Sequence, residues 1–227
     1  TFIGDEAYGL RGINMRKGAV MTWLAILIHP YASVSEFILG HRRKYFNPVA
    51  ILLMLSTFYA VVFALVGKEF TPTARADYPL FRWLICSYYD YATLHPAANM
   101  LLMLPFYALA MKTVFRRRSD LNYVEYLYIG IFLSVFEITL MILALPAELF
   151  IPWYSSFYMQ MLPVFIYTGF VFWKLFGLKK KGAVLRTLLV DMLQYVYAFF
   201  AALGLLTLSL GIYYLVAPEK FKEELNI

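Results

Sequence analysis

Long apolar runs, separated by short polar and basic stretches, dominate the pattern along the chain. Five of these runs are about 20 residues long, which is the length a helix needs to cross the ~30 Å hydrocarbon core of a bilayer. They cover residues 48–66, 96–115, 123–145, 153–176 and 194–216. Pro105 and Pro163 lie inside the second and fourth runs and predict kinks there. The pattern therefore predicts an all-α, polytopic membrane helical bundle with about five transmembrane helices.

Two shorter apolar segments predict helices that do not cross the membrane. Residues 18–28 are apolar but too short to span, and Pro30 ends them. Residues 32–39 have the pattern of a short amphipathic helix. The two segments together form either a bent pair in the membrane interface or a hairpin packed on the bundle. Residues 79–91 are aromatic-rich and amphipathic, and they predict a second interfacial helix.

The boundary between this pair and the first long run has clear start and stop signals. Gly40 is placed as a helix C-cap, and Asn47 followed by Pro48 is a typical helix start. Arg42, Arg43, Lys44 and Tyr45 lie between them. One interpretation is that these four residues bind anionic lipid headgroups. The other is a topology signal without any ligand.

Several residues in this region form a pattern that resembles a family signature. They are Gly18, Thr22, Pro30, Glu36-Phe37-Ile38, Gly40, Arg42 and Tyr45-Phe46-x-Pro48. They resemble the signature of a bacterial integral membrane protein family of unknown function, over residues 18–65. Many members carry a zinc ribbon ahead of this segment. It is absent here, because Cys86 is the only cysteine, so either this member lacks it or the chain was trimmed. The resemblance implies a multi-pass protein of the bacterial cytoplasmic membrane and supplies no activity.

Composition supports the membrane assignment. Apolar residues make up 62% of the 227 and charged residues 15%, whereas soluble domains carry about 25% charged residues. The net charge of +6 does not predict nucleic-acid binding, because the cations lie beside apolar runs. The single cysteine excludes an internal disulfide framework.

The basic residues predict an orientation. With the N-terminus inside, fifteen of the twenty Lys and Arg residues fall on the inner side. The positive-inside rule then predicts a cytoplasmic N-terminus and an outer C-terminus. It divides the chain into a basic cytoplasmic-side segment at 1–47, a five-span transmembrane domain at 48–216 and an outer tail at 217–227.

Glu137 is the strongest candidate for a functional residue. It lies within the third run, and an ionisable group at such depth faces the bundle interior or a water-filled cavity. Other polar residues reach comparable depth in their own runs, namely Asn99, Gln160, Thr207 and Ser209. We expect an intramembrane polar site around Glu137. It is either a substrate, ion or proton site, or a structural, protonated glutamic acid hydrogen-bonded across helices. Asp191 is expected to be a solvated charge at the interface.

No motif points to catalysis, to a metal or to a cofactor. The chain contains no HExxH, GxSxG, P-loop or paired-cysteine spacing. The expected function is a non-catalytic membrane module or accessory subunit that binds membrane lipids, including anionic lipids, or a protein partner. Small residues at Gly204 and Gly211 suit close packing with another span or another copy. One alternative is a small transporter or lipid-translocating protein that uses Glu137. The other is an intramembrane lipid-modifying enzyme with His95, Glu137 and Asn99.

Overall fold

The computed structural model describes residues 18–66, 79, 82–83, 86–88, 90–91, 95–150 and 156–216. Every regular element among them is helical, which confirms the predicted all-α class. The helices are α1 (Ala19–Ile28), α2 (Pro30–Ile38), the short 3-10 helix η2 (Arg42–Lys44), α3 (Pro48–Val66), α5 (Pro96–Phe115), α6 (Tyr123–Phe150), α7 (Ser156–Leu175) and α8 (Lys180–Val216). The predicted tail at 217–227 and residues 1–17 lie outside the described residues.

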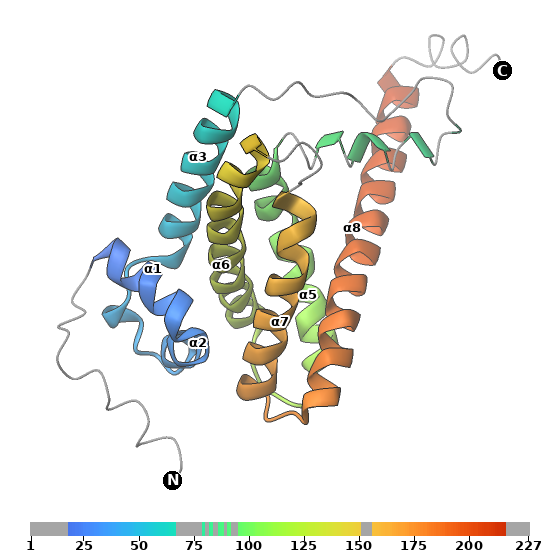
Figure 1. The fold of residues 1–227 in the computed structure, drawn as a ribbon. Helices are drawn as coiled ribbons and strands as arrows, with labels where there is room; N and C mark the ends of the chain where they lie inside the picture. Colours follow the sequence, from blue (N-terminus) through green and yellow to red (C-terminus); the bar gives the residue numbers. More distant parts are fainter. Residues whose placement is uncertain are drawn as a thin grey trace.

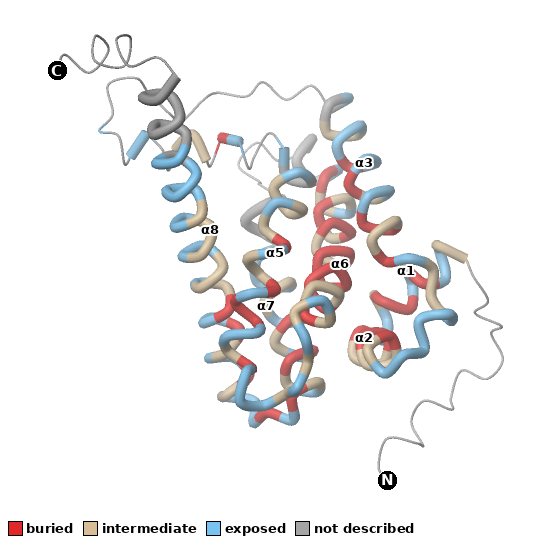
Figure 2. Tube along the Cα trace, turned by 180° about the vertical axis from the view of Figure 1, so that it is seen from behind, coloured by how far each residue is buried: buried red, intermediate tan, exposed pale blue. Residues whose placement is uncertain are grey.

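Five long helices run alongside one another and alternate in direction (Figure 1). Helix α6 is the central one, because it contacts α3, α5 and α7. More than half of its apolar stretch, 56%, is buried, whereas only 6% of the corresponding stretch of α8 is buried. Figure 2 shows this contrast, with buried residues concentrated along α6 and an exposed upper part of α8. The core therefore forms around α6, and α8 closes the bundle on its outer side.

Three helices have the length and hydropathy needed to cross a membrane. Their qualifying stretches are Ala98–Phe115 in α5, Tyr123–Pro146 in α6 and Lys180–Leu205 in α8. Helices α3 and α7 contain shorter apolar stretches, Pro48–Phe63 and Met161–Leu175. The described residues are therefore compatible with a membrane protein.

Two predicted span boundaries differ from the helices. The third span was expected to stop before Pro146, but α6 continues through Pro146 to Phe150. The fifth span was expected to begin at Gln194, but α8 is a single helix that starts at Lys180. No proline interrupts residues 180–216, so the backbone has no reason to break near Asp191. Hydropathy alone placed that boundary too late.

Helices α1 and α2 form a hairpin that packs on the bundle. Trp23 Nε1 donates a hydrogen bond to Thr139 Oγ1 on α6 at 2.8 Å. The hydroxyl of Tyr167 on α7 donates to the carbonyl oxygen of Ile26 at 2.7 Å. Val34 and Phe37 are buried in the core. The structure therefore agrees with the second interpretation of this segment, a hairpin packed on the bundle.

The predicted caps on either side of η2 are present. Gly40 has a φ of +96°. His41 N donates to Glu36 O at 3.0 Å and Gly40 N to Phe37 O at 3.3 Å, which is the Schellman pattern. The Asn47 side chain accepts a hydrogen bond from Val49 N at 3.0 Å and caps α3. These contacts fix the turn between the hairpin and α3.

Three basic runs lie at one end of the bundle. Residues 42–44 precede α3, residues 116–118 follow α5, and residues 179–181 connect α7 to α8. In Figure 1 all three segments are at the lower end of the long helices. We refer to this end as the basic end and to the opposite end as the far end.

Candidate functional site

A cavity of about 510 Å³ lies among helices α5, α6, α7 and α8. It is partly enclosed, and its lining residues include the middle of α6, from Leu133 to Met141. Its walls combine polar side chains with methionine, leucine and aromatic residues. Cavities between the helices of a bundle are a common location for ligand sites, and sites for small molecules typically measure about 300–1,000 Å³. This cavity is therefore large enough to hold a small ligand.

Glu137 on α6 and Asp191 on α8 both line the cavity. Asp191 was expected at the membrane interface. Because α8 begins at Lys180, Asp191 instead lies eleven residues into a continuous helix, about 16 Å along its axis at 1.5 Å per residue. Glu137 is only half-buried, because the cavity reaches its side chain.

Hydroxyl and amide groups surround the two acids. Tyr107 on α5 and Thr168 on α7 both line the cavity. Asn99 lines it nearer the far end and accepts a hydrogen bond from the Tyr88 hydroxyl at 3.1 Å. Burial raises the pKa of Tyr88, so this phenol remains a donor at neutral pH. The cavity thus offers neutral oxygen atoms from α5 and α7.

No basic side chain is among the described residues that line the cavity. Ionisable groups inside a membrane protein are usually paired with each other or with backbone carbonyls. Glu137 and Asp191 carry the same sign of charge and cannot neutralise each other. The cavity can therefore hold them as neutral acids, or as carboxylates with a cation bound between the helices.

Two prolines lie at the depth of the cavity. Pro105 in α5 follows Leu104, and Pro163 in α7 lies between Leu162 and Val164. Those three neighbours line the cavity. Each proline removes a helical hydrogen bond and leaves a carbonyl oxygen free. The walls from α5 and α7 are therefore less regular than the wall from α6 at this depth.

The predicted polar site is only partly assembled by the structure. Glu137 and Asn99 line the same cavity. Thr207 does not; it is exposed on α8 and donates to Gly204 O at 2.9 Å. The side chains of Gln160 and Ser209 lie outside the described residues. Sequence reasoning missed Gln194, Tyr107 and Thr168 as lining residues.

The three residues proposed for an enzyme do not share this cavity. His95 precedes α5 at the far end and is exposed, and it is not among the residues that line the cavity with Glu137 and Asn99. Among the described residues, no three His, Cys, Asp or Glu side chains converge on a metal-binding position.

The predicted headgroup-binding residues have different surroundings. Lys44 Nζ lies 3.3 Å from Glu36 Oε2, and the Tyr45 hydroxyl donates to the same oxygen at 3.1 Å. The Arg42 guanidinium lies 5.7 Å from the Phe37 ring centroid and 5.8 Å from that of Tyr128. Arg43 is exposed. Glu36 therefore offsets part of the positive charge of this run.

Comparisons of the chain with models of protein families, with curated proteins and with solved structures found no match.

Proposed function

We propose that this chain is an integral membrane protein that binds a small cation between α5, α6, α7 and α8 and carries it across the membrane. The observation that supports this proposal is the sharing of one cavity by Glu137 and Asp191 without a basic lining residue. This is the transporter alternative drawn from the sequence, with Asp191 added to Glu137.

We infer that α3, α5, α6, α7 and α8 all cross the membrane. They alternate in direction, and the three basic runs fall at one end (Figure 1). A five-span protein of a bacterial cytoplasmic membrane with its N-terminus inside has this arrangement, since positive residues remain on the cytoplasmic side. The cavity then lies within the membrane, with Glu137 about midway along α6.

The energetics of the bilayer favour a cation as the ligand. Placing one charged carboxylate at the centre of a membrane helix costs about 2.5–3.5 kcal/mol on insertion scales. A bound cation offsets that cost for whichever acid is ionised. Hydroxyl and amide oxygens from Tyr107, Thr168 and Asn99 supply further neutral ligands. An anionic ligand would add to the charge of the two acids and is disfavoured.

Release on the other side requires the helices around the cavity to move. Helix α8 is the least buried of the candidate spans, with 6% of its stretch buried. Pro105 in α5 and Pro163 in α7 each remove a backbone hydrogen bond from their helix at the depth of the cavity. We propose that these three helices rearrange around α6, which stays fixed by its contacts with α3 and with the α1–α2 hairpin.

The proposal is tested by binding and flux of monovalent cations. Purified protein is titrated with Na⁺, K⁺, tetraethylammonium and Ag⁺, and the ions that bind are followed across proteoliposomes. Glu137→Gln and Asp191→Asn should each weaken binding by roughly tenfold or more, because each removes an acid that can ionise when the cation binds. Asp120→Asn changes an exposed acid outside the cavity and should have no effect. Binding that is unchanged in both cavity variants would contradict the proposal.

A lipid-binding module is the second candidate, favoured by the gathering of three basic runs at one end. Arg42→Gln should then weaken association with anionic vesicles by about 1 kcal/mol. Lys44→Gln should have a smaller effect, because Glu36 already pairs with Lys44. Equal association with neutral and anionic vesicles would leave the runs as topology signals.

A further inference from the structure

Four of the chain's ten methionines line the cavity between α5, α6, α7 and α8. They are Met100 and Met103 on α5, Met141 on α6 and Met161 on α7. Methionine is used elsewhere in the chain as an ordinary core residue, as at the fully buried Met111. The cavity differs because its thioethers come from three helices and share the space with Glu137 and Asp191.

The spacing of these residues directs them to common faces. Met100 and Met103 are three residues apart on α5, and Glu137 and Met141 are four apart on α6. Residues at these separations are neighbours on a helix surface, with Cβ atoms about 5–6 Å apart. The carboxyl of Glu137 therefore lies one turn from a thioether on its own helix. Across the cavity, α5 presents two more.

Thioether sulfur is a soft, neutral ligand that selects Cu(I) over hard ions such as Mg²⁺ and Ca²⁺. Harder ions need more oxygen ligands, and the described residues hold no group of three His, Cys, Asp or Glu. The number of carboxyl groups also favours a monovalent ion. A monovalent ion needs one carboxylate to neutralise it, and the second acid can keep its proton.

Resting on the proposed function, we propose that the cavity binds a soft monovalent metal ion of the Cu(I) and Ag(I) class. The ligands are the thioethers of Met100, Met103 and Met141 together with the Glu137 carboxylate. Met161 is 51% exposed at the rim and is the thioether that the ion meets on entry. Asp191 keeps its proton, so the filled cavity carries no net charge.

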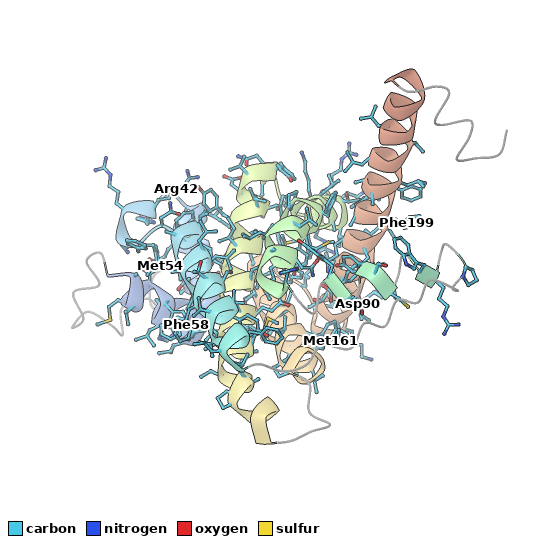
Figure 3. The ribbon with its side chains drawn as sticks, turned by 90° about the horizontal axis from the view of Figure 1, so that it is seen from above. Arg42, Met54, Phe58, Asp90, Met161 and Phe199 are labelled. Atoms are coloured by element: carbon cyan, nitrogen blue, oxygen red, sulfur yellow. The ribbon has the colours of Figure 1, made fainter. Side chains whose placement is uncertain are left out.

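The test compares two sets of methionine replacements in a Cys86→Ser background, because a thiol would itself bind the probe. The cavity variant is Met100→Leu/Met103→Leu/Met141→Leu. The control is Met21→Leu/Met54→Leu/Met192→Leu, at three exposed positions outside the cavity. Met54, for example, is 60% exposed on α3 at the flank of the bundle (Figure 3). Leucine preserves volume and apolarity in both sets.

Ag⁺ bound per protein is measured by elemental mass spectrometry after gel filtration, and Cu⁺ affinity by competition with a chromophoric chelator. The cavity variant should lose affinity roughly tenfold or more, as expected when metal ligands are disturbed. The control should bind like the parent protein. If the triple cavity variant does not fold, Met100→Leu and Met141→Leu are measured singly.

The outcomes separate this inference from the proposed function. Equal Ag⁺ affinity in the cavity and control sets overturns the soft-metal assignment. If tetraethylammonium or K⁺ still binds and depends on Glu137 in that case, the proposed cation site stands without the metal. If no cation binds in a Glu137-dependent way, both fail. Loss of Ag⁺ binding in the cavity set and in Glu137→Gln, with the control unchanged, supports both.

Discussion

The side chain of Glu36 pairs with part of the basic run at residues 42–44. Its carboxylate contacts Lys44 at 3.3 Å and accepts the Tyr45 hydroxyl at 3.1 Å. These contacts turn Lys44 and Tyr45 back toward α2. Arg42 lies over two aromatic rings instead. Two members of the predicted headgroup site therefore also have a local structural role.

The Tyr45–Glu36 contact predicts a dependence of stability on alkaline pH. Burial, and then the Glu36 charge, raise the pKa of Tyr45 above its ordinary value of 10.0. Above about pH 10, the unfolded chain loses this proton before the folded chain does, so the free energy of unfolding falls as pH rises. The loss should be at most about 1 kcal/mol at pH 11, because partial exposure screens the interaction.

Thermal unfolding of the wild type and of Tyr45→Phe at pH 8 and pH 11 measures this contribution. The wild type should lose more stability than Tyr45→Phe between the two pH values. Tyr31→Phe, on the same helix as Glu36 but outside the pair, should respond like the wild type. The same pH response in wild type and Tyr45→Phe would show that this contact does not govern alkaline stability.

Among the helices, the approach of α5 to α6 depends on a glycine. A Cβ atom at Gly130 would lie 3.2 Å from Leu104 Cδ2 and 3.3 Å from Tyr107 Cδ1. Gly130→Val should therefore destabilise the protein by about 1–3 kcal/mol, as overpacking does. It should also weaken cation binding, because Leu104 and Tyr107 line the cavity.

Gly204→Val is the matched control, since a Cβ there meets nothing within 4 Å. It should change stability by about 0.5 kcal/mol or less. Unfolding in detergent and cation titration are measured on both variants. Equal effects at Gly130 and Gly204 would mean that the close approach of α5 to α6 is not a constraint. Gly204 was expected to pack closely, and within the chain it does not.

Helix ends could be predicted where a capping residue or a glycine with a positive φ marks them. Asn47 and Pro48 begin α3 as expected, and Gly40 ends the hairpin through its positive φ. The two failures have different causes. Pro146 was expected to end the third span, but α6 continues through it, because a helix tolerates proline when neighbouring groups satisfy the backbone. The α8 start was missed because its first turns are basic but still helical.

The candidate site was predictable to the extent that depth along a span can be read. Glu137 and Asn99 were placed together on depth alone, and both line the cavity. Asp191 was missed because the fifth span was expected to begin at Gln194, three residues after it. Thr207 lies twelve residues beyond Tyr195, the last α8 residue that lines the cavity, about 18 Å further along the helix. Its depth was misjudged because the fifth span was expected to begin at Gln194 rather than at Lys180.

At the scale of the whole molecule, the basic runs and the cavity are separated along the bundle. The basic runs are at one end of the bundle, while Glu137 lies fourteen residues into α6 from that end, about 21 Å along the helix. Such separation keeps the cavity away from cations that would neutralise its acids. It also means that orientation in the membrane decides from which side a ligand enters.

The single cysteine tests that orientation directly. Cys86 belongs to short helical stretches between residues 82 and 91, which lie at the far end (Figure 1). If the basic end is cytoplasmic, Cys86 faces outward. A membrane-impermeant maleimide should then label it in intact cells. Lys179→Cys, in a Cys86→Ser background, is at the basic end and should be labelled only after the membrane is permeabilised. Cys86 has intermediate exposure, so labelling of the permeabilised wild type provides the reference for its reactivity. The reverse pattern would invert the bundle and place the mouth of the cavity on the cytoplasmic side, and the cation would then be taken up from the cytoplasm.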